Sequence, residues 1–220
     1  MLHKRNRVRT RIHEDMAMKL VAVCLGHAEK LPGKSYKTGI YKMPVSAPVM
    51  VDRLGLVGDA VCNSKHHGGE DQAILLEGSL TLDWWAAELG HDVLPGTFGE
   101  NLVVAGLDNR DVAVGDRFHL GEVTLEATCA RSPCNTLAAR MGDPKFLKAY
   151  TQAGRPGIYC RVIQTGMVAA GDPVRYEPVA GDRVGIAEML AALGRRLSRP
   201  EKDRFLAAPI GSRWRQKFSA

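Results

Sequence analysis

The chain has 220 residues, of which 45% are hydrophobic, enough for one sizeable core with a small appendage. No segment approaches the ~20 consecutive apolar residues of a membrane span, and the N-terminal residues lack the apolar stretch of a secretory signal. Five cysteines without a CxxC spacing favour free thiols in a reducing compartment. We therefore expect a cytoplasmic protein without membrane association.

The net charge of +6 comes from the two ends of the chain. Residues 1–15 hold five Lys or Arg against two acids, and 195–220 hold eight against two, which leaves 17 basic and 20 acidic residues in 16–194. A nucleic-acid-binding protein usually carries its basic residues on one folded face, so nucleic acid is not an expected partner. We interpret 1–17 as a basic extension that is disordered or reflects a start codon set too early.

Residues 19–178 are predicted to form many short strands joined by turns. The Gly-Asp pairs at 58–59, 115–116, 171–172 and 181–182 indicate turns, because glycine supplies unusual φ angles and aspartate bonds the nearby backbone. In EVTLEAT (122–128) the residues alternate as in a half-buried strand. Strands are expected at 19–25, within 38–51 and 54–63, and at 73–77, 100–106, 112–128 and 157–178; helices are expected at 79–89, 135–141 and 144–154. This pattern predicts a β-rich barrel or sandwich.

The character of the sequence changes after Pro178, where helical spacing replaces strand patterns. One apolar helical face contains Ile186, Met189, Leu190, Leu193 and Leu197. We interpret this stripe as packing rather than as a ligand groove. Ser198 and Glu201 form a predicted capping box with Pro200 in the first turn. Residues 179–220 are therefore expected to form two or three short basic helices.

The segment RSPCNTL (131–137) is the strongest candidate for chemistry. Pro133 ends the preceding strand because it lacks a backbone donor and disfavours helix at Ser132, and Asn135 is the predicted N-cap of the next helix. Cys134 then lies close to a helix N-terminus, which favours its thiolate, and Arg131 adds positive charge. This environment suits a reactive or metal-binding cysteine.

The residues alone leave several kinds of site open. Cys134 could be the nucleophile of a hydrolase with His67 as base. A zinc site from His66, His67, Cys129 and Cys134 has the wrong local spacing for a structural finger. In HHGGED (66–71) the glycines allow close backbone approach and an anion-binding nest, or merely a bend. In GTFGENLVV (96–104) the polar residues could line a pocket or bond backbone groups.

Taken in order, the motifs TGIYKMPV, GLVGD, HHGGEDQA, FGENL, VGDRFHLG, RSPCNTL and GIYCRVI resemble the MOSC domain family. MOSC denotes the molybdenum cofactor sulfurase C-terminal domain, and the resemblance covers 18–178, with 179–220 similar to the three-helix extension of stand-alone bacterial members. It implies a β-rich, mainly β or α+β fold: a barrel with short peripheral helices and a small C-terminal helical appendage.

The resemblance also implies a molybdenum cofactor, a pterin dithiolene with a terminal phosphate. Cys134 matches the family cysteine that ligates molybdenum, and would be both catalytic and metal-binding. The resemblance further implies cofactor contacts from Lys42, His67, Gly68, Gly69, Glu100, Asn101, Arg131 and Arg161. Which of His66 and His67 faces the site stays open, and Arg161 could instead face solvent. At family level, pyridoxal phosphate binding is also implied, for which no residue of this chain is singled out.

The expected function is a molybdenum-dependent reduction of small N-hydroxylated compounds, such as hydroxylaminopurine-like bases and amidoximes. The chain has no cluster motif for its own electrons, so an external electron-donor reductase is an implied partner, and a homodimer is left open. The alternative is a non-catalytic carrier of molybdenum cofactor, or of sulfur as a Cys134 persulfide. The third hypothesis is a β-barrel interaction module in which the cysteine is only structural.

Overall fold

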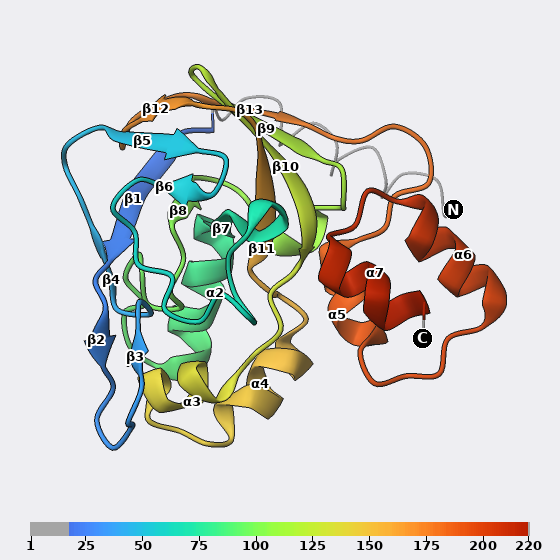
Figure 1. Ribbon diagram of the computed structural model, residues 1–220, viewed down its shortest axis with the longest axis horizontal. Coiled ribbons are helices and arrows are strands. Elements are labelled where there is room, and N and C mark those ends of the chain that lie inside the picture. The colour runs from blue at the N-terminus through green and yellow to red at the C-terminus, as the bar shows by residue number, and fades with distance from the viewer. Residues whose placement is uncertain (1–17, 220) are drawn as a thin grey trace, which may run out of the picture.

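The computed structural model describes residues 18–219 and confirms a β-rich fold with short helices (Figure 1). The expectation for 1–17 lies outside the described residues. The strands are β1 (Leu20–Gly26), β2 (Glu29–Lys30), β3 (Lys37–Thr38), β4 (Lys42–Pro44), β5 (Val49–Asp52), β6 (Gly55–Leu56), β7 (Ile74–Gly78), β8 (Leu102–Val104), β9 (Arg117–Leu120), β10 (Val123–Ala130), β11 (Ile158–Gln164), β12 (Gly166–Val168) and β13 (Val174–Glu177). The helices are α2 (Ser79–Leu89), α3 (Asn135–Met141), α4 (Phe146–Ala153), α5 (Ile186–Ala192), α6 (Arg199–Ala207) and α7 (Ser212–Ser219), with 3-10 turns at Glu70–Gln72 and Asn109–Asp111. No helix among residues 18–219 is long and apolar enough to cross a membrane.

One large mixed sheet organises the barrel, in the order β13-β9-β10-β11-β7-β8-β1-β4. Neighbouring strands are antiparallel except β7 and β8, which are parallel because α2 lies in the connection between them. The start of β1 bonds to the segment before β13, where the Leu20 N–H donates to the carbonyl of Asp172 over 2.8 Å. The sheet therefore curls until its two ends meet, and the small sheet β12-β5-β6 covers one end (Figure 1).

Strand β10 is buried along all eight residues, although its sequence alternates. The difference arises because the C-terminal helices cover the face that was expected to be exposed, and α5 packs against this strand. The polar residues on β10 find partners there: Glu126 pairs with Arg117 and Arg161, and the Thr128 hydroxyl donates to backbone carbonyls. A strand covered on both faces loses the exposed side that alternation predicts.

The C-terminal helices α5, α6 and α7, within residues 179–219, form what we call the appendage (Figure 1). Its apolar stripe is packing, as predicted, because Ile186, Met189 and Leu190 are buried in the same core as the barrel strands. The capping box of α6 is confirmed, with Ser198 and Glu201 bonding each other's backbone N–H groups. Phe205 of α6 and Phe218 of α7 stack with ring centroids 4.7 Å apart.

A second apolar cluster lies beneath α2, α3 and α4, on the side of the sheet next to the candidate functional site. Its centre is aromatic: Trp85 lies 5.2 Å from Phe146 and 5.8 Å from Tyr150 between ring centroids. This cluster fixes α3 and α4 against the end of β10 and so places the segment between β10 and α3.

Candidate functional site

A cavity of about 800 Å³, its open mouth included, lies where β10 ends and α3 begins. Its walls come from the turn before β4, the loop 59–68, the starts of β7 and β8, and the segment between β10 and α3. The structure brings six of the predicted site residues to this cavity: Lys42, His67, Gly68, Asn101, Arg131 and Cys134. Cys62, which the sequence analysis did not single out, also lines it.

Cys134 occupies the N-cap position of α3, with extended backbone angles (φ −138°, ψ 164°). The prediction that Asn135 is the N-cap is therefore wrong by one residue, because the helix already begins at Asn135. In this position the side chain accepts no capping hydrogen bond, and its sulfur lies at the positive end of α3, which favours the thiolate. The strand break at Pro133 is confirmed, since β10 ends at Ala130.

The surroundings of Cys134 favour its thiolate. Burial alone would raise the pKa, but the neighbouring His67, the charge of Arg131 and the N–H of Leu137 together lower the pKa of Cys134 from 9.0 to about 6. By contrast, burial raises the pKa of Cys24 to about 12 and that of Cys129 to about 11. Cys134 is thus much more readily ionised than these two buried cysteines.

His67, rather than His66, belongs to the cavity. His66 is exposed, whereas His67 is half-buried, with Nδ1 3.4 Å from the Tyr159 hydroxyl. Cys129 is buried elsewhere, in contact with Gln72 and Thr128. No group of three or more His, Cys, Asp or Glu residues within 18–219 is arranged to hold a metal, so the four residues of the zinc alternative are not assembled.

Arg131 is a buried cation with an unused donor. It is 5% exposed, and its Nη1 has no hydrogen-bond partner among the described residues. The guanidinium carbon lies 5.6 Å from the centre of the Tyr150 ring. A buried donor of this kind is costly unless a ligand bonds to it, and guanidinium matches oxyanions well. Arg131 and the Cys134 thiolate therefore fit an anionic group that accepts a sulfur ligand.

Lys42 and Asn101 meet at Asp59, a residue that the sequence analysis assigned only to a turn. Lys42 Nζ bonds both carboxylate oxygens of Asp59, and Asn101 Nδ2 donates to Asp59 over 2.9 Å. The Asn101 amide oxygen in turn accepts from the N–H of Leu75 at 3.1 Å. Asp59 thus neutralises Lys42 on the cavity wall, and the Gly58-Asp59 motif gave no signal of this long-range partner.

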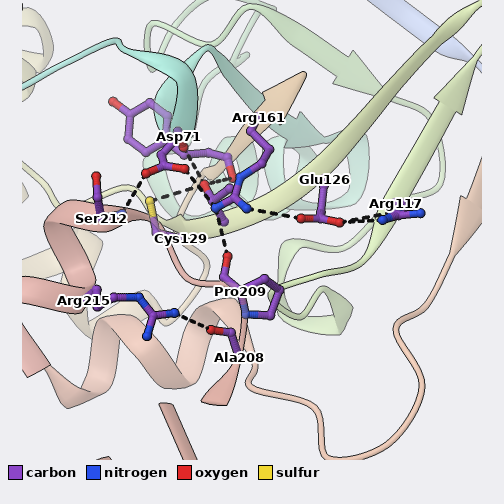
Figure 2. A network of polar contacts seen from close by, with 11 residues as sticks. Asp71, Arg117, Glu126, Cys129, Arg161, Ala208, Pro209, Ser212 and Arg215 are labelled. Carbon is purple, nitrogen blue, oxygen red and sulfur yellow. Dashed lines mark hydrogen bonds and ion pairs between the residues drawn. The ribbon is translucent and has the colours of Figure 1, made fainter. Parts of the chain in front are cut away.

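Three predicted residues lie away from the cavity. Glu100 is fully buried, and its carboxylate accepts from the N–H groups of Gly96 (2.6 Å) and Phe98 (3.0 Å). Gly69 lines a separate crevice beside the appendage. Arg161 points toward the appendage, pairing with Asp71 at 2.9 Å and donating to the carbonyl of Pro209 (Figure 2).

Comparisons with known proteins identify the family of this chain. Residues 63–175 match the MOSC domain. The uncharacterized protein YflK of Bacillus subtilis is 35% identical over 139 residues, covering 63% of this chain and 63% of YflK. A Gibberella moniliformis protein named "Reductase" is 34% identical over 148 residues, covering 64% of this chain and 26% of that protein. The chain thus spans less than two thirds of the length of these curated relatives.

Solved structures extend the similarity to the appendage. The crystal structure of YiiM from Geobacillus stearothermophilus superposes with a TM-score of 0.76 at 27% sequence identity, covering 92% of this chain and 97% of that one. The family match spans half of the chain, and the residues that it includes contain His67, Arg131 and Cys134. This chain belongs to the MOSC domain family.

Proposed function

We propose that this chain binds the molybdenum cofactor in the Cys134 cavity and reduces small N-hydroxylated compounds. The observation that carries the proposal is the pairing of a low-pKa thiol, Cys134, with the buried Arg131, whose Nη1 lacks a partner among the described residues. A soft thiolate suits a molybdenum centre, and the unused N–H suits the anionic pterin phosphate or an oxo group. The fungal relative named "Reductase" supports an oxidoreductase.

In this proposal each residue of the cavity has a defined task. Cys134 would supply the sulfur ligand, and His67, on the wall of the same cavity, favours its thiolate form. Arg131 donates to anionic oxygens, while Asp59 and Asn101 keep Lys42 in place on the opposite wall. The bound cofactor would supply two-electron chemistry, and the protein would orient the substrate beside it.

The overall reaction balances without an oxidant. An N–OH group takes up two electrons and two protons, its N–O bond breaks, and the products are N–H and water. The electrons come from a separate reductase that docks on this protein, which is the proposed partner. The cavity is open at one side, so a small substrate can enter.

The first experiment is metal and pterin analysis of protein purified from a host that makes the cofactor. We expect molybdenum and pterin with the wild type, and loss of the metal in Cys134→Ser. Cys62→Ser is the matched control, because Cys62 is exposed and lines the same cavity but lacks the Arg131 and His67 contacts that lower the pKa of Cys134. Equal metal loss in both variants, or no cofactor in the wild type, would contradict the proposal.

The carrier alternative gives a different result in the same preparations. A reductase turns over an N-hydroxylated purine or an amidoxime when an artificial reductant is present, whereas a cofactor carrier does not. A sulfur carrier shows a persulfide on Cys134 after incubation with a cysteine desulfurase. The low pKa of Cys134 favours either chemistry, so turnover decides between them.

A further inference from the structure

The segment that carries His67 has few attachments of its own. Residues 61–69, here called the site loop, contain no helix or strand, and most of their side chains are exposed. Within the loop, the N–H groups of His66 and His67 both donate to the carbonyl of Asn63. A loop with so little buried apolar surface opens easily unless another element holds it.

The side chain of Arg213, on α7, holds the site loop. Its guanidinium donates to the carbonyl of Ser64 (2.9 Å), to the carbonyl of Gly68 (3.1 Å) and to Oε1 of Gln72 (2.6 Å). Ser64 and Gly68 lie on either side of His67, so one planar cation fixes both flanks of the histidine. Arg213 is half-buried between the loop and the appendage.

The start of α7 is fixed against the same region by separate bonds. The Ser212 N–H donates to Asp71 Oδ2 at 2.7 Å, and Asp71 also pairs with Arg161 (Figure 2). The Gly211 N–H donates to the carbonyl of Thr128 over 3.1 Å. A side chain at 211 would press on Asp71, since an added Cβ would lie 3.2 Å from its Cβ. These contacts place Arg213 over the loop.

On the other side of the loop, the position of His67 is set by Tyr159. Its hydroxyl lies 3.4 Å from His67 Nδ1, and its carbonyl accepts from the Thr128 hydroxyl at 3.0 Å. The Thr128 hydroxyl also bonds the carbonyl of Asp71. The loop is therefore held between strand β11 and helix α7, with His67 on the wall of the cavity that Cys134 also lines.

We propose that Arg213 is a positioning residue of the Cys134 site, and that the appendage serves to hold the site loop so that His67 keeps its place on the wall of the Cys134 cavity. The inference rests on the proposed function only for the identity of the ligand that the cavity takes. In this proposal the appendage helps to hold one wall of the site, rather than only packing against the outside of the barrel.

The test is hydrogen–deuterium exchange on the full-length, cofactor-free protein, comparing Arg213→Ala with Arg215→Ala. Arg215 is a matched control because it lies on the same helix and also donates to two carbonyls, those of Leu206 and Ala208, but within the appendage (Figure 2). We expect amide exchange in 61–70 to rise about tenfold in Arg213→Ala, as loss of charged hydrogen bonds predicts. In Arg215→Ala the same amides should exchange as in the wild type.

Exchange in β10 serves as the internal reference for global stability. Equal exchange of the site loop in the two variants, or an increase in Arg213→Ala that is uniform along the chain, would overturn the inference. Should Arg213→Ala fail to fold, Arg213→Lys replaces it, and an intermediate increase is expected because an ammonium group cannot span both carbonyls and Gln72. If Arg213→Ala does not fold and loop exchange in Arg213→Lys is unchanged, the inference about Arg213 is also overturned.

Cofactor-containing protein gives a second readout, which distinguishes a failure of the proposed function from a failure of the role of Arg213. In cofactor-containing preparations, molybdenum and pterin should leave Arg213→Ala several-fold faster than Arg215→Ala. The reason is that the loop carrying His67, which lines the cavity beside the proposed metal ligand, is held less firmly. If the wild type holds no molybdenum, the proposed function fails while the exchange experiment still decides the role of Arg213. If the wild type holds molybdenum and the loop is unaffected, only the role of Arg213 is refuted.

Discussion

Cys134 shows how one side chain acquires its chemistry from where a strand ends and a helix begins. Pro133, the third residue after the end of β10, and the helix start at Asn135 together leave the sulfur at an N-cap position. By contrast, burial raises the pKa of Cys24, Cys129 and Cys160, which lie in the apolar core.

The lowered pKa of Cys134 predicts a pH profile for its alkylation in the cofactor-free protein. The rate should rise through a midpoint of about pH 6 rather than 9.0. His67→Ala should move the midpoint upward, because it removes a neighbour that favours the thiolate; His66→Ala, at the exposed neighbour, should not. Peptide mass spectrometry separates Cys134 from Cys62, and a midpoint that is identical in both histidine variants would contradict the assignment.

The same group links stability to pH in a defined direction. The folded pKa of Cys134 is about 6 and its ordinary value is 9.0, so the unfolded chain binds the extra proton between these values. The stabilising contribution is complete above pH 9 and is lost as pH falls through 6. Cys134→Ser should therefore flatten the dependence of unfolding free energy on pH between 6 and 9.

At the scale of elements, the Gly-Asp turns do more than reverse the chain. Gly115 has φ +88°, which favours glycine, and the fully buried Asp116 accepts from the N–H groups of Ala113 (2.7 Å) and Val179 (2.8 Å). Its carboxylate also bonds the Tyr176 hydroxyl and Arg183. One aspartate therefore joins the barrel to the segment that leads into the appendage.

Replacing Asp116 with asparagine should lower the free energy of unfolding by about 3 kcal/mol, because it removes a buried charge that is paired and hydrogen-bonded. Asp182→Asn is the control: Asp182 also follows a glycine, but it pairs with Arg204 at the surface, where such pairs contribute about 1 kcal/mol or less. Urea denaturation of both variants measures the difference, and equal losses would be inconsistent with the buried network.

Local signals predicted the elements well, and long-range contacts were outside their reach. The turn at Gly115, the break at Pro133 and the capping box at Ser198 each depend on a few neighbouring residues, and all are present. The partner of Lys42 and the covered face of β10 depend on segments far away in the chain. For Glu100 the sequence left two interpretations open, because a polar residue at the start of a strand can face a cavity or bond backbone N–H groups; in the structure it bonds those of Gly96 and Phe98.

For the whole molecule, one apolar core runs from the barrel into the appendage. Trp214 and Phe218 of α7 are buried in the same cluster as Phe118 of β9 and Leu125 of β10. A continuous core of this kind makes unfolding cooperative. The barrel and the appendage should therefore unfold in one transition.

Trp214→Ala tests this cooperativity. Removing a buried tryptophan should lower the free energy of unfolding by about 3–5 kcal/mol. The two remaining tryptophans, Trp84 and Trp85, lie on α2 beside the barrel, so their fluorescence reports only on that side. Their urea transition should shift with the mutation; an unshifted transition would mean that the appendage unfolds independently.

The contact between Arg213 and the site loop also has a consequence for the order in which the protein is made. Gln72 and Arg213 are 141 residues apart in the chain, so the loop leaves the ribosome long before the side chain that fixes it. Through most of translation the His67 segment therefore lacks the attachment that we propose for it. A ligand that needs His67 in its final position would bind after α7 has docked, which places loading of this site after synthesis rather than during it.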